Sequence, residues 1–126
     1  MGLTHQNGLT RVRVNVKNLA LANETYTADF LVDSGAADSL APGSELARIG
    51  VQRVGKRVYE LADGSKQEYP FGVAQISFLG EITAGRVIFG PDDAEPLLGI
   101  TALESVGIVV DPTNRILKRS PAIPVK

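Results

Sequence analysis

One aspartate in this chain stands where a carboxylate could do chemistry. Asp33 opens the triplet Asp33-Ser34-Gly35, which ends the apolar run Phe30-Leu31-Val32. The pattern predicts a carboxylate on a tight turn at the end of a buried strand. There Gly35 allows a close approach of the backbone, and the Ser34 hydroxyl can hydrogen-bond to neighbouring main chain. The triplet alone is also typical of an aspartate that caps a β-turn.

A turn carboxylate of this kind could hydrolyse a peptide bond with a second carboxylate beside it. Water attack on an amide needs a base for the water and an acid for the carbonyl oxygen, and two carboxyl groups that share one proton supply both. The triplet occurs once, because Asp63-Gly64-Ser65 has a different order and the composition of a turn. A second Asp33 must therefore come from a second chain, across a two-fold axis. The sequence predicts a homodimer with one active site at its interface.

A second signal lies downstream, where Leu97-Leu98-Gly99 leads into residues 100–107 and predicts a short helix. Together with the Asp33 triplet, this layout resembles the retropepsin-like (clan AA) aspartic proteases, above all their small single-lobe prokaryotic members. The resemblance extends over about residues 10–118. It rests on Leu31-Val32-Asp33-Ser34-Gly35-Ala36, Leu61-Ala62-Asp63-Gly64, Pro96-Leu97-Leu98-Gly99, and Ala102-Leu103-Glu104 running on to Val110-Asp111-Pro112.

The resemblance implies a role for each matched segment. Asp33 would be the catalytic carboxylate, which shares the attacking water with its symmetry mate. Ser34 would brace the two turns across the dimer axis, Gly35 would line the substrate backbone, and Ala36 would support the turn. A strand formed by Leu97, Leu98 and Gly99 would pass beneath the turn. The flap that closes over a peptide and excludes water would be the hairpin tip Ala62, Asp63, Gly64 and Ser65.

The sequence also departs from the retroviral members of that family. Ser34 stands where many relatives have Thr, while Ala37 and Ile100 replace the acidic residue and the arginine that brace the retroviral turn. The flap tip is polar and short, and the tail 119–126 contains prolines, which cannot donate to a strand ladder. We therefore expect a dimer interface built differently from the retroviral one.

Apolar alternation and turn signals predict many short strands around these motifs. Val12, Val14 and Val16 alternate with polar residues, as in a half-buried strand, and residues 25–32 form the strand that leads to Asp33. The Asp63-Gly64 pair marks a hairpin turn because it tolerates positive φ. Further strands are expected at 53–61, 66–70, 71–79, 82–89, 108–110 and 115–117, with turns at 80–81 and 112–114, and a helix at 44–49 with a Ser44 cap and a Gly50 stop.

These elements predict an all-β fold, a closed retropepsin-like β-barrel with one or two short helices and one lobe per chain. At 126 residues the chain is one domain by length, with its core at about 10–118 and a Pro-containing tail at 119–126. A net charge of −1 and scattered basic residues give no case for nucleic acid or for an anionic membrane. Residues 1–6 lack the apolar core of a signal peptide, so a cytoplasmic location is expected.

Other chemically capable residues have simpler interpretations. Asp92, Asp93 and Glu95 lack the ligand spacing of a calcium loop and are interpreted as a solvated loop, so no metal site is expected. His5, the single histidine, is expected in a disordered N-terminal segment without catalytic partners. The chain has no cysteine, which excludes disulfides and thiol chemistry.

We therefore expect a homodimeric aspartic endopeptidase that needs no metal or cofactor. Its substrate would be a peptide or protein segment bound in extended form beneath the flaps, with apolar side chains flanking the scissile bond. Tyr59 and Tyr69 lie near the flap base and could reach such a peptide, although core or rim packing is the simpler role. Two alternatives stay open: a module that keeps the fold and binds peptides without cleaving them, and a monomeric structural domain attached to a larger assembly.

Overall fold

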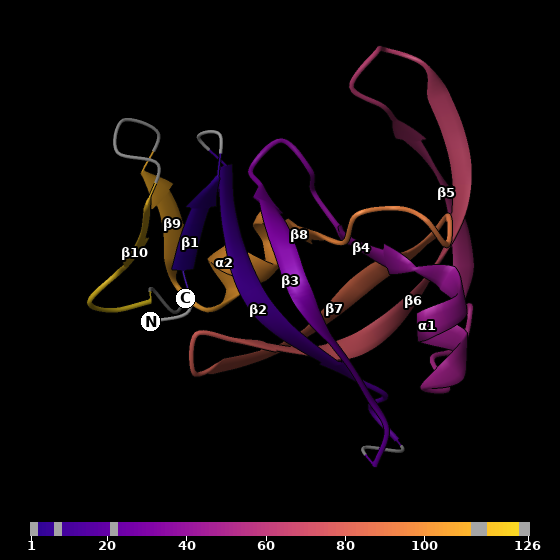
Figure 1. Ribbon diagram of the computed structural model, residues 1–126, viewed down its shortest axis with the longest axis horizontal. Helices are drawn as coiled ribbons and strands as arrows, with labels where there is room; N and C mark the ends of the chain where they lie inside the picture. Colours follow the sequence, from indigo (N-terminus) through magenta and orange to yellow (C-terminus); the bar gives the residue numbers. More distant parts are fainter. Residues whose placement is uncertain (1–2, 7–8, 21–22, 112–115, 124–126) are drawn as a thin grey trace.

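The strand expected around Val12, Val14 and Val16 is present, and all of these valines are buried. In the computed structural model, which describes residues 3–6, 9–20, 23–111 and 116–123, the strand is β2 (Leu9–Lys17), and each valine is at most 1% exposed. β2 pairs antiparallel with β3 (Thr25–Asp33), which adds Phe30 to the core. β3 ends at Asp33, where the predicted turn begins (Figure 1).

Short strands make up most of the remaining chain. β1 (Leu3–Gln6) precedes β2 and pairs with its first half. The described residues contain two short helices, α1 (Gly43–Arg48) and α2 (Ile100–Ser105). The other described strands are β4 (Ser39–Pro42), β5 (Gly55–Glu60), β6 (Lys66–Phe78), β7 (Glu81–Gly90), β8 (Leu97–Gly99), β9 (Ile108–Asp111) and β10 (Ile116–Arg119).

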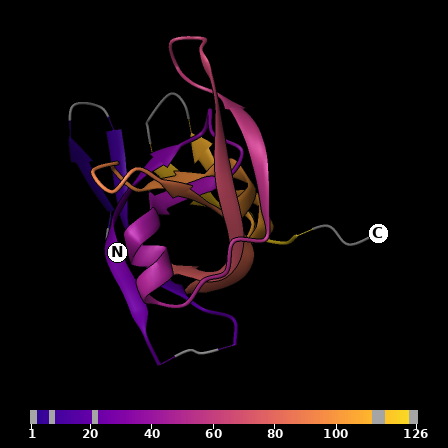
Figure 2. The ribbon, with the colours of Figure 1, turned by 90° about the vertical axis from the view of Figure 1, so that its right-hand side faces the viewer.

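Strand pairing closes the sheet into a barrel. The strands follow the order β1-β2-β3-β8-β4-β7-β6-β5, and an additional pairing of β2 with β6 completes a ring of six of the described strands. β1 and β5 extend the sheet on either side, and β9 pairs with β10 separately. The predicted all-β closed barrel with one or two short helices is confirmed for the described part of the chain. Figure 2 shows the β5–β6 hairpin rising beyond the barrel wall.

Apolar side chains from the strands and from both helices fill the barrel. Leu46 of α1 and Leu103 of α2 are fully buried, so each helix is attached through its apolar side. In β6, Ala74, Ile76 and Phe78 are buried at every second position, because side chains alternate between the two faces of a strand. Burial of one such large side chain is worth roughly 1.5–3 kcal/mol, so this core is the main stabilising contribution.

The predicted hairpins are present with two adjustments. Gly64 has φ +84° in the Asp63-Gly64 turn, as expected. The next turn is centred on Leu79 and Gly80, both with positive φ, so β7 begins at Glu81 rather than at residue 82. The predicted break between 66–70 and 71–79 is absent, because both belong to β6. The pairing of β6 with β7 begins only at Phe71, so the strand neighbour of Pro70 is β5. The N–H that proline lacks therefore removes no hydrogen bond to β7.

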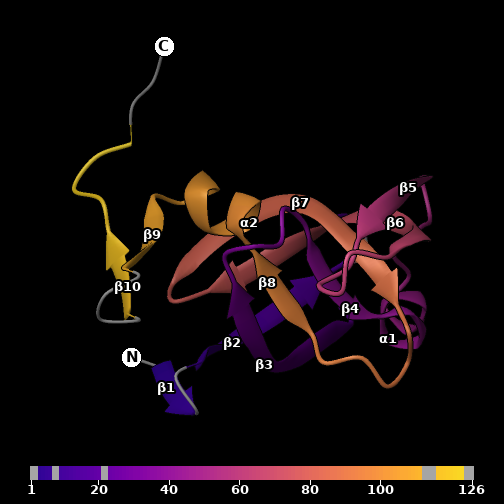
Figure 3. The same cartoon turned by 90° about the horizontal axis from the view of Figure 1, so that it is seen from above.

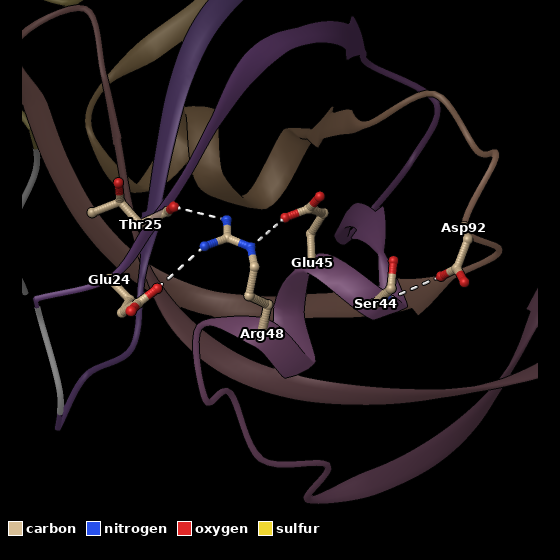
Figure 4. Close-up of polar contacts among 6 residues, drawn as sticks. All are labelled: Glu24, Thr25, Ser44, Glu45, Arg48 and Asp92. Carbon is tan, nitrogen blue, oxygen red and sulfur yellow. Dashed lines mark hydrogen bonds and ion pairs between the residues drawn. The ribbon is translucent and has the colours of Figure 1, made fainter.

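The expected cap of α1 was wrong. The helix begins one residue earlier, at Gly43, with Pro42 at the cap position and no capping side chain there. Ser44 therefore lies inside the first turn, where its backbone N–H donates to Oδ1 of Asp92 at 3.0 Å (Figure 4). The predicted glycine stop is present, since Gly50 follows the helix with φ +84°.

The chain ends differ in part from expectation. The backbone of His5, expected to be disordered, lies in β1 and pairs with Thr10, because backbone hydrogen bonding to β2 requires no apolar pattern. The predicted turn at 112–114 lies outside the described residues, although the strands on either side of it pair as β9 and β10. Residues 120–123 of the predicted tail are exposed and outside any strand. Among the described residues, no helix has the length and apolarity needed to cross a bilayer.

Candidate active site

Asp33 occupies the last position of β3, on a turn that fixes its carboxylate. The backbone N–H of Gly35 donates to Asp33 Oδ1 at 3.0 Å, and the N–H of Ala36 donates to the Asp33 carbonyl oxygen at 3.1 Å. The first bond is an Asx-turn, in which an aspartate stabilises a turn through its own side chain. Among the described residues Oδ2 has no hydrogen-bond partner, so this oxygen is available to a ligand.

The predicted supporting strand lies directly beside this turn. β8 lies beside β3 (Figure 3) and pairs parallel with it. In this pairing Gly99 is the register partner of Asp33. Where α2 begins, the N–H of Ile100 donates to the carbonyl oxygen of Ala36 at 2.8 Å. The Gly99 N–H donates to the hydroxyl oxygen of Ser39, a polar side chain that is 2% exposed, at 3.0 Å. These bonds join the turn to a second strand and a helix, which makes its position rigid.

The two glycines at this site differ in whether the structure requires them. A Cβ on Gly99 would lie 2.6 Å from the carbonyl carbon of Asp38 and 2.8 Å from the carbonyl oxygen of Ala37, which no real side chain tolerates. A Cβ on Gly35 would meet only Asp33 Oδ1, at an ordinary 3.4 Å, and Gly35 has no positive φ. The fold therefore requires glycine at position 99, whereas Gly35 leaves open space next to the carboxylate.

A cleft of about 660 Å³ opens between this turn and the β5–β6 hairpin. Figure 1 shows the turn after β3 and the tip of the hairpin on the same, upper side of the molecule. The lining combines small turn residues, apolar and aromatic side chains, and carboxylates, and consists of Asp33, Gly35, Ala36, Ala37, Asp38, Leu40, Tyr59, Glu60, Leu61, Ala62, Tyr69, Ile88 and Leu97. The turn carboxylate thus lies in the wall of a cleft with a largely apolar surface.

The predicted flap is the tip of the β5–β6 hairpin, and Ala62 is the member of it that lines the cleft. The tip is organised by Asp63, whose Oδ1 accepts hydrogen bonds from the N–H and the hydroxyl of Ser65 at 2.9 and 2.6 Å. These bonds hold the pKa of the Asp63 carboxyl below its usual value. Asp63, Gly64 and Ser65 are exposed and lie outside the cleft lining.

Sequence reasoning missed Asp38, a second aspartate in the cleft. Its Oδ2 accepts a hydrogen bond from the Tyr59 hydroxyl at 3.0 Å, which connects the loop after the turn to β5. Burial, followed by the hydrogen bond to Asp38 and its negative charge, raises the pKa of Tyr59 to about 12. The sequence signal was available, because Asp38 follows the triplet within the same loop, but the partner on β5 is apparent only in three dimensions. Tyr69, predicted near the flap base, also lines the cleft, with its ring centroid 6.5 Å from that of Tyr59.

Ser34 lies at the exposed end of the turn and does not line the cleft. The bond to neighbouring main chain expected for its hydroxyl is not formed, since no described residue partners it. The hydroxyl is therefore available to a neighbouring molecule.

The acidic loop residues have separate structural partners. Asp92 accepts the Ser44 N–H, and Glu95 forms an ion pair with Arg11 at 2.6 Å, which ties the loop between β7 and β8 to β2. Within the described ranges, no group of three or more histidine or acidic side chains is placed to hold a metal ion. Comparison of the sequence with protein-family models and with curated proteins gives no match.

Proposed function

We propose that this protein is an aspartic endopeptidase that acts as a homodimer, with one Asp33 carboxylate from each chain. The observation that carries the proposal is the position of Asp33 on a hydrogen-bonded turn in the wall of the cleft, opposite an extended hairpin. The parallel β3–β8 pairing beside the turn and the glycine required at position 99 agree with the resemblance to retropepsin-like proteases.

In the proposed reaction, two facing Asp33 side chains share one proton and hold a water molecule between them. The ionised carboxyl takes a proton from the water, and the protonated one donates to the carbonyl oxygen of the peptide. The carboxyl that took the water proton then gives it to the amide nitrogen, while the other carboxyl takes a proton from one hydroxyl of the tetrahedral species. The C–N bond breaks, an amine and a carboxylic acid leave, and the shared proton is restored. The hydrogen bond from Gly35 keeps each Oδ1 oriented, so the oxygens are in place before the substrate binds.

The requirement for a second chain is supported by the groups that one chain leaves without partners. Ser34 is exposed and its hydroxyl has no hydrogen bond to a described residue, as expected of a group that completes its bonding across an interface. Within one chain, the other aspartate that lines the cleft is Asp38, and its carboxylate already accepts the Tyr59 hydroxyl. A second Asp33 is the better candidate for a proton-sharing partner.

The cleft lining favours a peptide with apolar side chains. Leu40, Leu61, Ile88 and Leu97 line the cleft together with the two tyrosines. Apolar side chains on either side of the scissile bond would be buried against them, at about 25 cal/mol per Å² of apolar surface removed from water. The space left by Gly35 would admit the substrate backbone close to the carboxylates.

A mixing experiment with the Asp33→Asn variant tests the proposal. The wild-type protein should cleave members of an apolar peptide library, whereas Asp33→Asn should cleave none, and Asp93→Asn, which alters an exposed loop carboxylate, should behave as wild type. An equimolar mixture of wild type and Asp33→Asn should show about half the activity per wild-type chain once subunits have exchanged, because mixed dimers hold one aspartate. Cleavage that survives Asp33→Asn, or that is insensitive to mixing, would refute the two-chain site.

The main alternative is a peptide-binding module that does not cleave. It is favoured by one observation, that Oδ1 of Asp33 already stabilises its own turn, a role that needs no catalysis. Isothermal titration with library peptides distinguishes the two functions. Binding by the wild type that persists in Asp33→Asn, without any cleavage at acidic or neutral pH, would assign the cleft to recognition alone.

A further inference from the structure

The hydrogen bond between Tyr59 and Asp38 joins the two sides of the cleft. Asp38 lies in the loop between the Asp33 turn and β4, and Tyr59 lies in β5, the outer strand of the hairpin. Both side chains line the cleft. The contact therefore runs from the part of the molecule that carries the proposed chemistry to the part that would cover a peptide.

The two ends of this bond differ in how firmly they are held. Asp38 precedes Ser39, which is 2% exposed and accepts the N–H of Gly99, so its loop is fixed to β8. β5 lies at the end of the sheet and pairs with β6 alone among the described strands, and residues 60–68 of the hairpin are exposed throughout. Segments with few buried contacts open most readily. A bond from the rigid loop to the hairpin thus restrains the more easily displaced element.

The donor of this bond keeps its proton under all ordinary conditions. The pKa of Tyr59 is raised to about 12, first by burial and then by its hydrogen bond to Asp38 and the charge of that carboxylate, while the charges of Arg86 and Arg57 oppose the shift. A phenol hydroxyl that donates to a carboxylate is a charge-assisted hydrogen bond, stronger than one between neutral groups. Near neutral pH the contact is therefore a stable restraint.

We propose that Asp38 and Tyr59 are positioning residues that latch the β5–β6 hairpin over the cleft and thereby control the entry of a peptide. The inference rests on the proposed function for its substrate, but the latch itself exists in the free protein. Entry of a peptide separates the hairpin from the loop, and the hydroxyl and the carboxylate are then free to bond to the carbonyl and N–H groups of an extended chain.

Amide hydrogen exchange in the free protein tests the latch without any peptide. In Tyr59→Phe and in Asp38→Ala, the amides of residues 57–69 should exchange about fivefold to tenfold faster than in the wild type, while those of β2 and β3 keep their rates. Asp38→Asn should retain most of the protection, because its amide oxygen still accepts the hydroxyl proton. Tyr69→Phe is the matched control, since the Tyr69 hydroxyl has no hydrogen bond to a described residue.

The possible outcomes separate the latch from the proposed function. Unchanged exchange of residues 57–69 in Tyr59→Phe and Asp38→Ala, or the same acceleration in Tyr69→Phe, would overturn the latch even in an active protease. Faster exchange in a protein that cleaves nothing would support a latch over a binding cleft. In an active enzyme, Tyr59→Phe should lower KM with little change in kcat, because a peptide no longer has to break the charge-assisted bond in order to enter. A fall in kcat at constant KM would contradict a positioning role.

Discussion

At the scale of single residues, hydrogen bonds to main chain determine the orientation of the candidate catalytic group. Asp33 accepts the Gly35 N–H, and Ser39 accepts the Gly99 N–H from the neighbouring strand. The second contact is buried, so without it the Gly99 N–H would remain unsatisfied next to the core, whereas the first lies at an exposed turn. The Asp33 carboxylate is consequently oriented by an N–H of its own turn, and the turn is held by the neighbouring strand, rather than by other charged groups.

Replacement of Gly99 by alanine should destabilise the protein, because the new methyl group would overlap the backbone of Asp38 and Ala37. We expect a loss of about 1–3 kcal/mol in the free energy of unfolding, measured by urea denaturation. Gly85→Ala in β7 is the control, since a Cβ there meets nothing within 4 Å and should leave the stability unchanged or slightly raised. Equal effects of the two substitutions would show that the close packing of β8 under the turn is not rigid.

The Ser65 hydroxyl should control the ionisation of Asp63 at the hairpin tip. Hydrogen bonds from the Ser65 side chain and then from its N–H lower the pKa of Asp63, so Ser65→Ala should move that pKa up toward the ordinary value. Because the folded-state pKa is depressed, the contribution of this group to stability is present above the unfolded value and is lost as the pH falls through the folded value. A carboxyl-detected NMR titration measures the shift, and an unaltered Asp63 titration in Ser65→Ala would contradict it.

At the scale of elements, side chains far apart in sequence attach the helices and loops to the barrel. Arg48 of α1 forms ion pairs with Glu24 and Glu45 and donates to the carbonyl oxygen of Thr25, which fastens the helix to the start of β3 (Figure 4). Arg119 of β10 pairs in the same way with Glu81 at the start of β7. These contacts lie at the surface, so they supplement the apolar attachment through buried side chains.

A comparison of Arg48→Ala with Arg13→Ala measures how much such an attachment contributes to the free energy of unfolding. Arg48→Ala removes two ion pairs and a hydrogen bond to main chain, whereas Arg13→Ala removes one exposed ion pair with Asp29. We expect a loss of about 1 kcal/mol for the first and less than about 0.5 kcal/mol for the second. Thermal unfolding of both variants gives the values, and a larger loss for Arg13→Ala would contradict this account.

At the scale of the whole molecule, the proposed function requires two chains. The Asp33 turn and the hairpin tip lie on one side of the barrel, which leaves that side available to a symmetry mate (Figure 1). Two facing carboxyl groups hold a shared proton more tightly than separated chains do, because both cannot ionise freely at close range. The proposed dimer would then bind more protons than two monomers, and its stability would fall as the pH rises.

Self-association should therefore be tighter at about pH 5 than at about pH 8. Sedimentation equilibrium at micromolar concentration measures the dissociation constant at both values. In Asp33→Asn most of this pH dependence should disappear, whereas Asp93→Asn should retain it. A strict monomer at every concentration, or a pH dependence untouched by Asp33→Asn, would be incompatible with facing carboxylates.

The sequence by itself determined the local elements and the barrel class. The alternating valines of β2, the apolar run before Asp33 and the Asp63-Gly64 turn are local patterns, and each fixes a strand or turn through side-chain alternation or backbone freedom. Prediction from the sequence failed where a contact with a residue distant in sequence determines the local structure. Asp92 serves the first turn of α1 in place of the predicted Ser44 cap, and pairing with β2 orders the segment around His5.

Tertiary structure alone decided which side chains share the cleft. Asp38 and Tyr59 stand 21 positions apart and show no joint pattern, yet their oxygens lie 3.0 Å apart because the loop before β4 and the strand β5 line the same cleft. Likewise, Gly99 is required only because the pairing of β4 with β8 brings the backbone of Asp38 against it. Periodicity reports the direction in which each residue points within its own element, whereas such contacts depend on long-range pairing between elements, which leaves no mark in the local sequence.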